Sequence, residues 1–182
     1  MAAEGAKLTS FYMAAPLCRP SRDGLMTSCY PRRIDMAYGS DFTVLLAGDK
    51  KGLNPNEITI AEVLKSAGYK TGMFGKWHLG DQSEFLPTRQ GFDEFFGLPY
   101  SHDIHPDHAQ QKKFNFPPLP LLEGEQVLEL DPDADYLTQR FTQRAVKFID
   151  ANLLTTARLL EKRLRFGAKR GAHSKAVVVN PP

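Results

Sequence analysis

PLCRPSRDGLMTSCYPRR, at Pro16–Arg33, carries the strongest structural signal in the chain. Pro20 suits the first turn of a helix, because proline has no N–H to lose there and its φ angle is already helical. Leu25 and Met26 add an apolar face, so we expect a helix of roughly two turns. Cys18 is then expected in the loop at the helix N-terminus, where free N–H groups and the helix dipole favour an anion.

Arg22 follows Cys18 by about one helical turn and can direct its guanidinium toward the same place. A nucleophile beside cationic and N–H donors suits attack on a sulfate or phosphate ester. The alternative is that Cys18 is a small core residue and Pro20–Arg22 an ordinary turn before a helix.

A helix and a strand are expected further along the chain. Thr59 and Glu62 form a capping box, so a helix should cover about Ile60–Ala67. Its predicted apolar face consists of Ile60, Val63, Leu64 and Ala67.

The segment Tyr69–Phe74 is predicted to be a strand that leads into a polar ending. Because side chains alternate along a strand, Lys76 and His78 should lie on the same side if the chain stays extended. Alternatively, both are solvated residues at a strand end.

These two stretches resemble the two signatures of type I sulfatases. Cys18–Arg22 is similar to the Cys-x-Pro-Ser-Arg run, and Gly68–His78 is similar to the second signature. Gln90–Asp103 resembles a segment of arylsulfatases of the arylsulfatase A type. The resemblance implies an α/β fold: part of an alkaline-phosphatase-like sulfatase domain, with a mixed sheet between helices, incomplete here.

The resemblance also implies hydrolysis of sulfate esters, with a sulfated small molecule or a sulfated glycan as substrate. Cys18 would become formylglycine through a formylglycine-generating enzyme and act as the nucleophile. Arg22 and Lys76 would neutralise the sulfate, and His78 would donate a proton or orient the nucleophile. Ser101 would contact the substrate.

The family also implies Ca²⁺, but its ligand positions have no counterpart here, so no residue is assigned to a metal. We therefore expect a fragment that lacks the N-terminal metal-binding strand and the C-terminal half, with an unpaired sheet edge and little activity of its own. Without the family, the cluster His102, His105 and His108 could suggest a transition-metal site, although Pro106 breaks helical spacing.

Four further expectations concern local structure. Leu8–Met13 is predicted to be a short strand, and Ala37–Asn56 a loop-rich segment. The proline-rich Phe114–Leu122 is predicted to pack over the body as an extended loop. A helix should begin with Asp131 as N-cap and Pro132 at N1 and run to about Asn152.

Charge changes sharply after Asn152. The tail carries seven Lys and Arg against one Glu, a net of +6, so the first 152 residues carry −4 of the total of +2. We therefore expect a partial sulfatase domain at 1–152 and a basic out-of-family tail at 153–182. The acidic body gives no sign of a nucleic-acid partner.

Composition agrees with a globular protein of 182 residues, 42% hydrophobic and 24% charged. No apolar run is long enough for a membrane span, and no signal peptide is visible. Sulfatases are commonly periplasmic, extracellular or lysosomal, so localisation stays open. Two cysteines make no disulfide framework.

Two other functions remain open: a phosphonate or phosphate monoester hydrolase of the same superfamily, and a non-enzymatic protein whose basic tail binds a partner.

Overall fold

The computed structural model describes residues 7–40, 42–165 and 175–179. These residues form a five-stranded sheet in the order β4-β3-β2-β1-β5. The strands are β1 (Tyr69–Lys76), β2 (Glu94–Leu98), β3 (Pro120–Glu123), β4 (Gln126–Leu130) and β5 (Lys175–Val179). The helices are α1 (Cys18–Thr27), α2 (Ile60–Ser66), α3 (Gln111–Phe114) and α4 (Ala134–Arg165), with short 3₁₀ turns η1 (Ser83–Phe85) and η2 (Pro87–Arg89).

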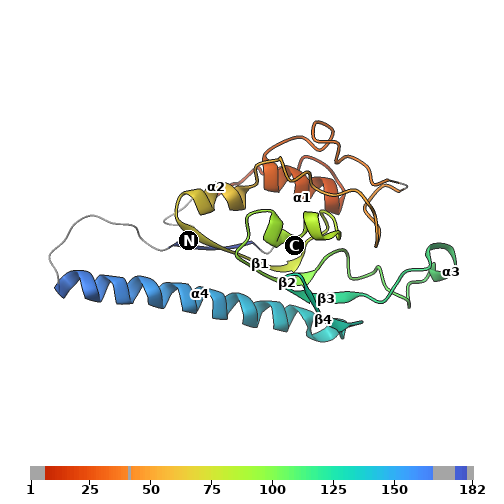
Figure 1. Cartoon of the computed structure of the whole chain (residues 1–182). Coiled ribbons are helices and arrows are strands. Elements are labelled where there is room, and N and C mark those ends of the chain that lie inside the picture. Colours follow the sequence, from red (N-terminus) through yellow and green to blue (C-terminus); the bar gives the residue numbers. More distant parts are fainter. Residues whose placement is uncertain (1–6, 41, 166–174, 180–182) are drawn as a thin grey trace.

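The sheet is mixed and lies between helices, as expected for the fold class. β1 pairs in parallel with β2 on one side and with β5 on the other, while β2–β3 and β3–β4 are antiparallel. α4 runs along one side of the sheet, and α1 and α2 lie on the opposite side (Figure 1).

The strands divide their side chains between two cores, because neighbours in a strand point to opposite faces. Met73 and Phe95 join the cluster on the α1 and α2 side, whereas Phe74 and Phe96 join the cluster on the α4 side. Each fully buried side chain of this size contributes about 1.5–3 kcal/mol of hydrophobic stabilisation.

The C-terminal ends of β1 and β2 lie close together because the paired residues there, Gly75 and Gly97, have no side chains. A Cβ placed on Gly97 would lie 1.8 Å from the carbonyl oxygen of Gly75. Backbone pairing continues past both strands, since the N–H of His78 donates to the carbonyl oxygen of Pro99. The residues that follow β1 and β2 are therefore brought to the same edge, where open α/β sheets place their sites.

Helix α1 begins two residues earlier than predicted. Cys18 is its first residue and not part of the preceding loop, and Leu17 is the N-cap in extended conformation. The difference arises because Pro20 occupies the third helical position, where its missing N–H is equally harmless. Ser28 ends the helix in the left-handed region, at φ 58°.

Helix α2 confirms its predicted start and corrects its predicted face. Thr59 and Glu62 form the capping box in both directions. However, Ile60 and Val63 are 41% and 54% exposed, and Ala61 is the buried residue. The small Ala61 allows the short helix to lie close against the body, which turns the larger side chains outward.

Two strand predictions and one extended-loop prediction have mixed outcomes. The strand predicted at Tyr69–Phe74 is confirmed and continues to Lys76. The strand predicted at Leu8–Met13 is wrong, because this segment is irregular and largely exposed, with no partner strand among the described residues. The proline-rich Phe114–Leu122 packs over the body with Leu119 and Leu121 buried, but its C-terminal end enters β3.

Helix α4 starts later and ends later than predicted. Asp133 accepts a hydrogen bond from the N–H of Asp135 and so caps the helix, whereas Asp131 instead accepts from the N–H of Leu119. The helix continues without a break across Asn152 to Arg165. In the described part of the chain, no helix combines the length and apolarity that crossing a membrane needs.

β1 is an inner strand of the described sheet. β5 lies beside it in parallel, with Tyr69 opposite Lys175 and Met73 opposite Val179. The edges of the described sheet are β4 and β5.

Candidate active site

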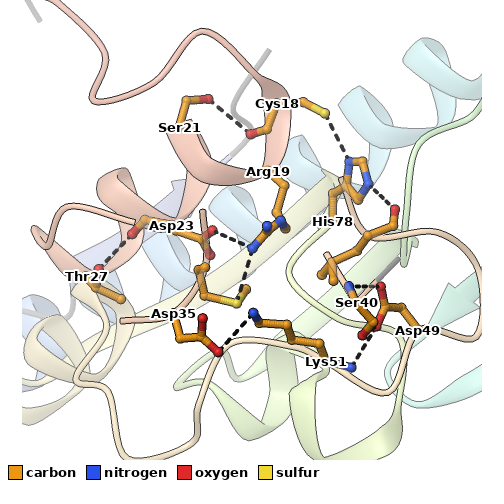
Figure 2. Close-up of polar contacts among 12 residues, drawn as sticks. Cys18, Arg19, Ser21, Asp23, Thr27, Asp35, Ser40, Asp49, Lys51 and His78 are labelled. Atoms are coloured by element: carbon orange, nitrogen blue, oxygen red, sulfur yellow. Dashed lines mark hydrogen bonds and ion pairs between the residues drawn. The ribbon is translucent and has the colours of Figure 1, made fainter. Parts of the chain in front are cut away.

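The first residue of α1 and the segment after β1 meet at one point. Cys18 Sγ lies 3.4 Å from His78 Nδ1 (Figure 2). His78 adopts a left-handed backbone at φ 63°, so the chain does not stay extended as the strand prediction assumed. This turn places the Trp77 side chain in the core and the His78 ring against Cys18.

The His78 ring is held in one tautomer. Its Nε2 lies 2.9 Å from the carbonyl oxygen of Leu45, which can only accept, so Nε2 carries the proton. Burial lowers the pKa of His78 to about 4; the bond to Leu45 opposes this shift, and the charge of Lys76 adds to it. His78 is therefore neutral near pH 7, and its Nδ1 is an acceptor directed at Cys18.

Arg22 and Lys76 form hydrogen bonds next to the contact between Cys18 and His78. Arg22 Nη1 donates to the carbonyl oxygen of Lys76 at 2.6 Å, and Lys76 Nζ donates to Ser101 Oγ at 3.2 Å. Burial lowers the pKa of Lys76; Cys18 and Asp103 oppose the shift, and Arg22 adds to it. Burial likewise lowers the pKa of Arg22, with Cys18 opposing.

Ser101 forms a hydrogen bond with Asp103, a carboxylate that was not among the predicted site residues. Partial burial raises the pKa of Asp103, but the hydrogen bond from Ser101 and the charge of Lys76 outweigh it, so the net shift is downward. Asp103 is therefore ionised near neutral pH.

A cavity of about 280 Å³ opens beside these residues. Cys18, His78, Ser101 and Asp103 form its polar end. Its other end is apolar and includes Phe42, Leu46, Ile104, Phe114 and Phe116. Of the predicted site residues, three line the cavity, and Arg22 and Lys76 reach it through their hydrogen bonds.

A buried charge pair lies just below Cys18. Arg19 Nη1 and Asp23 Oδ2 are 3.6 Å apart, and both side chains are fully buried (Figure 2). Arg19 Nη1 also donates to Met36 Sδ. Among the described residues, Arg19 Nε and Nη2 and both Asp23 carboxylate oxygens have no hydrogen-bond partner. Burial raises the pKa of Asp23 to about 8, with Arg19 and Lys51 opposing.

The described residues do not fit a calcium site. No group of three or more His, Cys, Asp or Glu side chains among them is arranged to hold a metal. Asp35 pairs with Lys51, and Asp49 with Ser40 (Figure 2). His105 and His108 each accept a backbone N–H through Nδ1. We therefore derive no catalytic step through a metal.

Cys18 and Cys29 are both free thiols.

Comparison with known proteins places the chain in a family. Residues 1–160 match the family model described as Sulfatase. The chain belongs to the sulfatase family. The match passes Asn152 by eight residues and ends within α4.

Individual relatives support this membership. Arylsulfatase G of Rattus norvegicus is 36% identical over 173 residues, which span 82% of this chain and 32% of that protein. Arylsulfatase A of Homo sapiens is 45% identical over 126 residues, 68% of this chain and 24% of that protein. This sulfatase chain thus spans about a third or less of these curated relatives.

A solved structure supports the fold. The crystal structure of Ps i-CgsB in complex with k-i-k-neocarrahexaose aligns with a TM-score of 0.63 and 26% identity, covering 92% of this chain and 34% of that one. The expected alkaline-phosphatase-like sulfatase fold is confirmed.

Proposed function

We propose that this sulfatase chain hydrolyses sulfate esters at the site formed by Cys18 and His78. The observation that carries the proposal is the contact of 3.4 Å between Cys18 Sγ and His78 Nδ1 at the polar end of a cavity. Two cations, Arg22 and Lys76, stand next to that contact. The match of residues 1–160 to the sulfatase family supports the same reaction class.

Cys18 fits the position of formylglycine, because its half-buried side chain faces both the cavity and His78. A hydrated formylglycine supplies a hydroxyl that attacks sulfur and breaks the S–O bond to the alcohol, which leaves with a proton. Loss of the proton from the second hydroxyl then breaks the Cβ–O bond to sulfate, which releases sulfate and regenerates the aldehyde. The neutral His78 accepts a proton from residue 18 at Nδ1 while Leu45 fixes the ring. Of the two roles that the sequence left open for His78, the contact of Nδ1 with residue 18 favours a hydrogen bond that orients the nucleophile over donation of a proton.

The remaining residues stabilise the negative charge of the sulfate group. Lys76 supplies a compact positive charge, and Ser101 holds the Lys76 ammonium group at 3.2 Å. Arg22 fixes the end of β1 through the Lys76 carbonyl and adds its charge to the site. Preorganised charges of this kind usually contribute more to the catalysis of group transfer than any other single effect.

The family supports Ca²⁺ as a cofactor of the whole enzyme, although no group of three or more His, Cys, Asp or Glu among the described residues is arranged to hold it. The substrate class we propose is a sulfated small molecule or sulfated glycan. The Ps i-CgsB complex, which holds a k-i-k-neocarrahexaose, supports the glycan option.

The first test is the modification of Cys18. Co-expression with a formylglycine-generating enzyme should convert Cys18 to an aldehyde and leave Cys29 a thiol, because only Cys18 precedes Arg-Pro-Ser-Arg. Peptide mass spectrometry and aldehyde labelling measure this conversion, which does not depend on turnover. A Cys29→Ser variant is the matched control and should be converted equally. An unmodified Cys18, in a host that matures other sulfatases, would refute the proposal.

The second test is recognition of the anion. Lys76→Ala should weaken binding of a sulfate ester by about tenfold or more, since a hydrogen bond to a charged group contributes about 1.5–3 kcal/mol. Lys70→Ala is the control, because Lys70 lies on the same strand with an exposed side chain. Equal weakening by both variants would remove Lys76 from the site. Tighter binding of a matched aryl phosphonate would favour a phosphonate hydrolase.

A further inference from the structure

Asp103 is a carboxylate beside the proposed sulfate site to which the reaction at sulfur assigns no role. We propose that Asp103 is a positioning residue, which acts through Ser101 to hold Lys76 in place and to keep it positively charged for the sulfate group. In this role Asp103 does not touch the reacting atoms. The inference rests on the proposed function and adds to it the residue on which the charge of Lys76 depends.

Asp103, Ser101 and Lys76 form one chain of hydrogen bonds. Lys76 Nζ donates to Ser101 Oγ at 3.2 Å, and the Ser101 hydroxyl forms a hydrogen bond with the Asp103 carboxylate. Because an ionised carboxylate only accepts, the hydroxyl donates its proton to Asp103. A hydroxyl has one proton, so Ser101 has none left for a sulfate oxygen. Ser101 therefore connects the carboxylate to the ammonium group instead of donating to the substrate.

A tight turn fixes Asp103 beside Ser101. The N–H of Ile104 donates to the carbonyl oxygen of Ser101 at 3.0 Å, which closes a turn over residues 101–104. Ile104 is 4% exposed and anchors this turn in the core. Lys76 ends β1 and is paired with Leu98, the last residue of β2. The sheet and the turn therefore hold both ends of the hydrogen-bonded chain in place.

The surroundings of the Lys76 ammonium group oppose its charge. Burial lowers the pKa of Lys76, and the charge of Arg22 on α1 lowers it further, while Cys18, also on α1, and Asp103 raise it. His78 lies nearby but is neutral near pH 7. A hydrated formylglycine at position 18 carries no negative charge. Among the described residues that act on Lys76, Asp103 is then the negative charge that remains.

Asp103 is itself held in the ionised form. Partial burial raises its pKa, but the hydrogen bond from Ser101, a bond to its own backbone and the charges of His102 and Lys76 lower it, so the net shift is downward. The carboxylate and the ammonium group thus each favour the charged form of the other. Two of the three N–H groups of the ammonium can still donate to sulfate oxygens, because Ser101 accepts only one.

Lysine acylation measures the charge of Lys76 without any substrate. Only an unprotonated amine reacts with acetic anhydride, so the rate of Lys76 acylation against pH, read by peptide mass spectrometry, gives the midpoint of its deprotonation. All proteins compared are the full 182-residue chain with Cys18→Ser, because a thiol would react and titrate in the same range. Lys70 is the internal reference, since it lies on the same strand with an exposed side chain.

Asp103→Asn should lower the Lys76 midpoint by about one pH unit, because asparagine still accepts the Ser101 hydrogen bond but carries no charge. Asp107→Asn is the matched control and should leave the midpoint unchanged, since Asp107 is an exposed aspartate of the same loop outside the cavity lining. A Lys76 midpoint that stays in place in Asp103→Asn, or one that moves together with that of Lys70, would overturn the proposal.

Calorimetric titration with ethyl sulfate, as pH is raised from neutral, tests the consequence for anion binding. Affinity should fall as Lys76 loses its proton, and in Asp103→Asn this fall should begin about one pH unit lower. Circular dichroism verifies that each protein stays folded. Weakening by the same factor at every pH would indicate a merely structural role and overturn the proposal. If ethyl sulfate binds at no pH while the Lys76 midpoint shifts as expected, Asp103 keeps its role and the proposed function fails.

Discussion

Helices α1 and α4, on opposite sides of the sheet, bury opposite kinds of side chain. On α4 the buried residues are apolar, such as Leu137 and Phe148, and the charges of Arg140 and Arg144 reach outward to glutamates. On α1 the charged Arg19, Arg22 and Asp23 are buried beside Met26. One helix follows the rule that charges stay in water, and the other breaks it.

The difference between the apolar residues buried by α4 and the charged residues buried by α1 indicates that α4 has a structural role and α1 a functional one. Burying a charge costs free energy that a pair recovers only with good geometry, and the Arg19–Asp23 pair at 3.6 Å leaves several polar atoms without partners. Proteins tolerate such violations mainly where function requires them. α1 is also the helix that begins at Cys18, so the violation lies at the proposed active site.

The α4 side should lose the most stability when an apolar residue is truncated. Phe148→Ala should cost about 3–5 kcal/mol, because Phe148 is 3% exposed and its ring lies 5.5 Å from that of Phe74. Urea unfolding followed by circular dichroism measures the loss. Val146→Ala, at a position 50% exposed on the same helix, is the control and should change stability by about 0.5 kcal/mol or less. Similar costs for both would show that α4 is not packed as described.

The α1 side should respond differently to single and paired changes. Above about pH 8, where Asp23 is ionised, Asp23→Ala leaves the Arg19 guanidinium buried without its partner and should cost about 3 kcal/mol. The double change of Arg19→Met and Asp23→Leu should be close to neutral, because it removes both buried charges together. Urea unfolding of both proteins makes the comparison. If the double change costs as much as the single one, the charge pair is a net source of stability and the contrast with α4 fails.

The pH dependence of stability should also be traceable to α1. The native chain holds the Asp23 proton up to about pH 8, whereas the unfolded chain releases it near its ordinary pKa of about 4. Asp23 therefore stabilises the fold at low pH, and this contribution falls as pH rises toward 8. His78 acts in the opposite direction: its pKa of about 4 adds stability above its ordinary pKa of about 6.5, which is lost as pH falls toward 4.

The interval between about pH 6.5 and 8 isolates Asp23, because His78 is neutral in both states above its ordinary pKa. Stability of the unmodified chain should fall by about 2 kcal/mol across it, and Asp23→Asn should flatten that slope. Urea midpoints at several pH values measure it. His78→Gln is the control and should keep the slope; an unchanged slope in Asp23→Asn would exclude Asp23 as its source.

The smallest effect should come from the ion pairs at the surface of α4. Arg144 Nη1 lies 2.6 Å from Glu123 Oε1, and its guanidinium lies 4.6 Å from the centroid of the Phe96 ring. Both partners are partly exposed, so Arg144→Ala should cost about 1 kcal/mol or less, and part of that should vanish in high salt. Unfolding at low and high ionic strength measures it. A loss above about 2 kcal/mol would mean that α4 also depends on its charges.

The sequence predicted the elements whose signals are local. Thr59 and Glu62 cap α2 through partners three residues apart, so the capping box was visible in the sequence. The start of α4 was misplaced because Asp131 and Asp133 are equally good caps. The choice between them was made by the N–H of Leu119, twelve residues away, which Asp131 accepts. The β3–β4 hairpin was missed, although Gly124, at φ 61°, marks its turn.

The site was predicted only as far as the family resemblance reached. Cys18 and His78 are 60 residues apart, and no local pattern places them 3.4 Å from each other. Leu45, which fixes the His78 tautomer through its backbone carbonyl, has no sequence signal at all. Asp103 and the ring of Phe42 enter the cavity because of how two loops pack. Such contacts depend on tertiary structure and are not encoded in spacing.

The pairing of β1 with β5 has a consequence for the order of folding. Tyr69 lies opposite Lys175, so β1 leaves the ribosome roughly a hundred residues before its neighbour. At synthesis rates of about 5–20 residues per second, one edge of β1 waits on the order of 5–20 seconds for β5. β2 follows β1 closely and can protect the other edge early. During synthesis the half-built sheet therefore presents the strand that leads to Lys76 and His78 as an open edge, available to any passing strand and to chaperones.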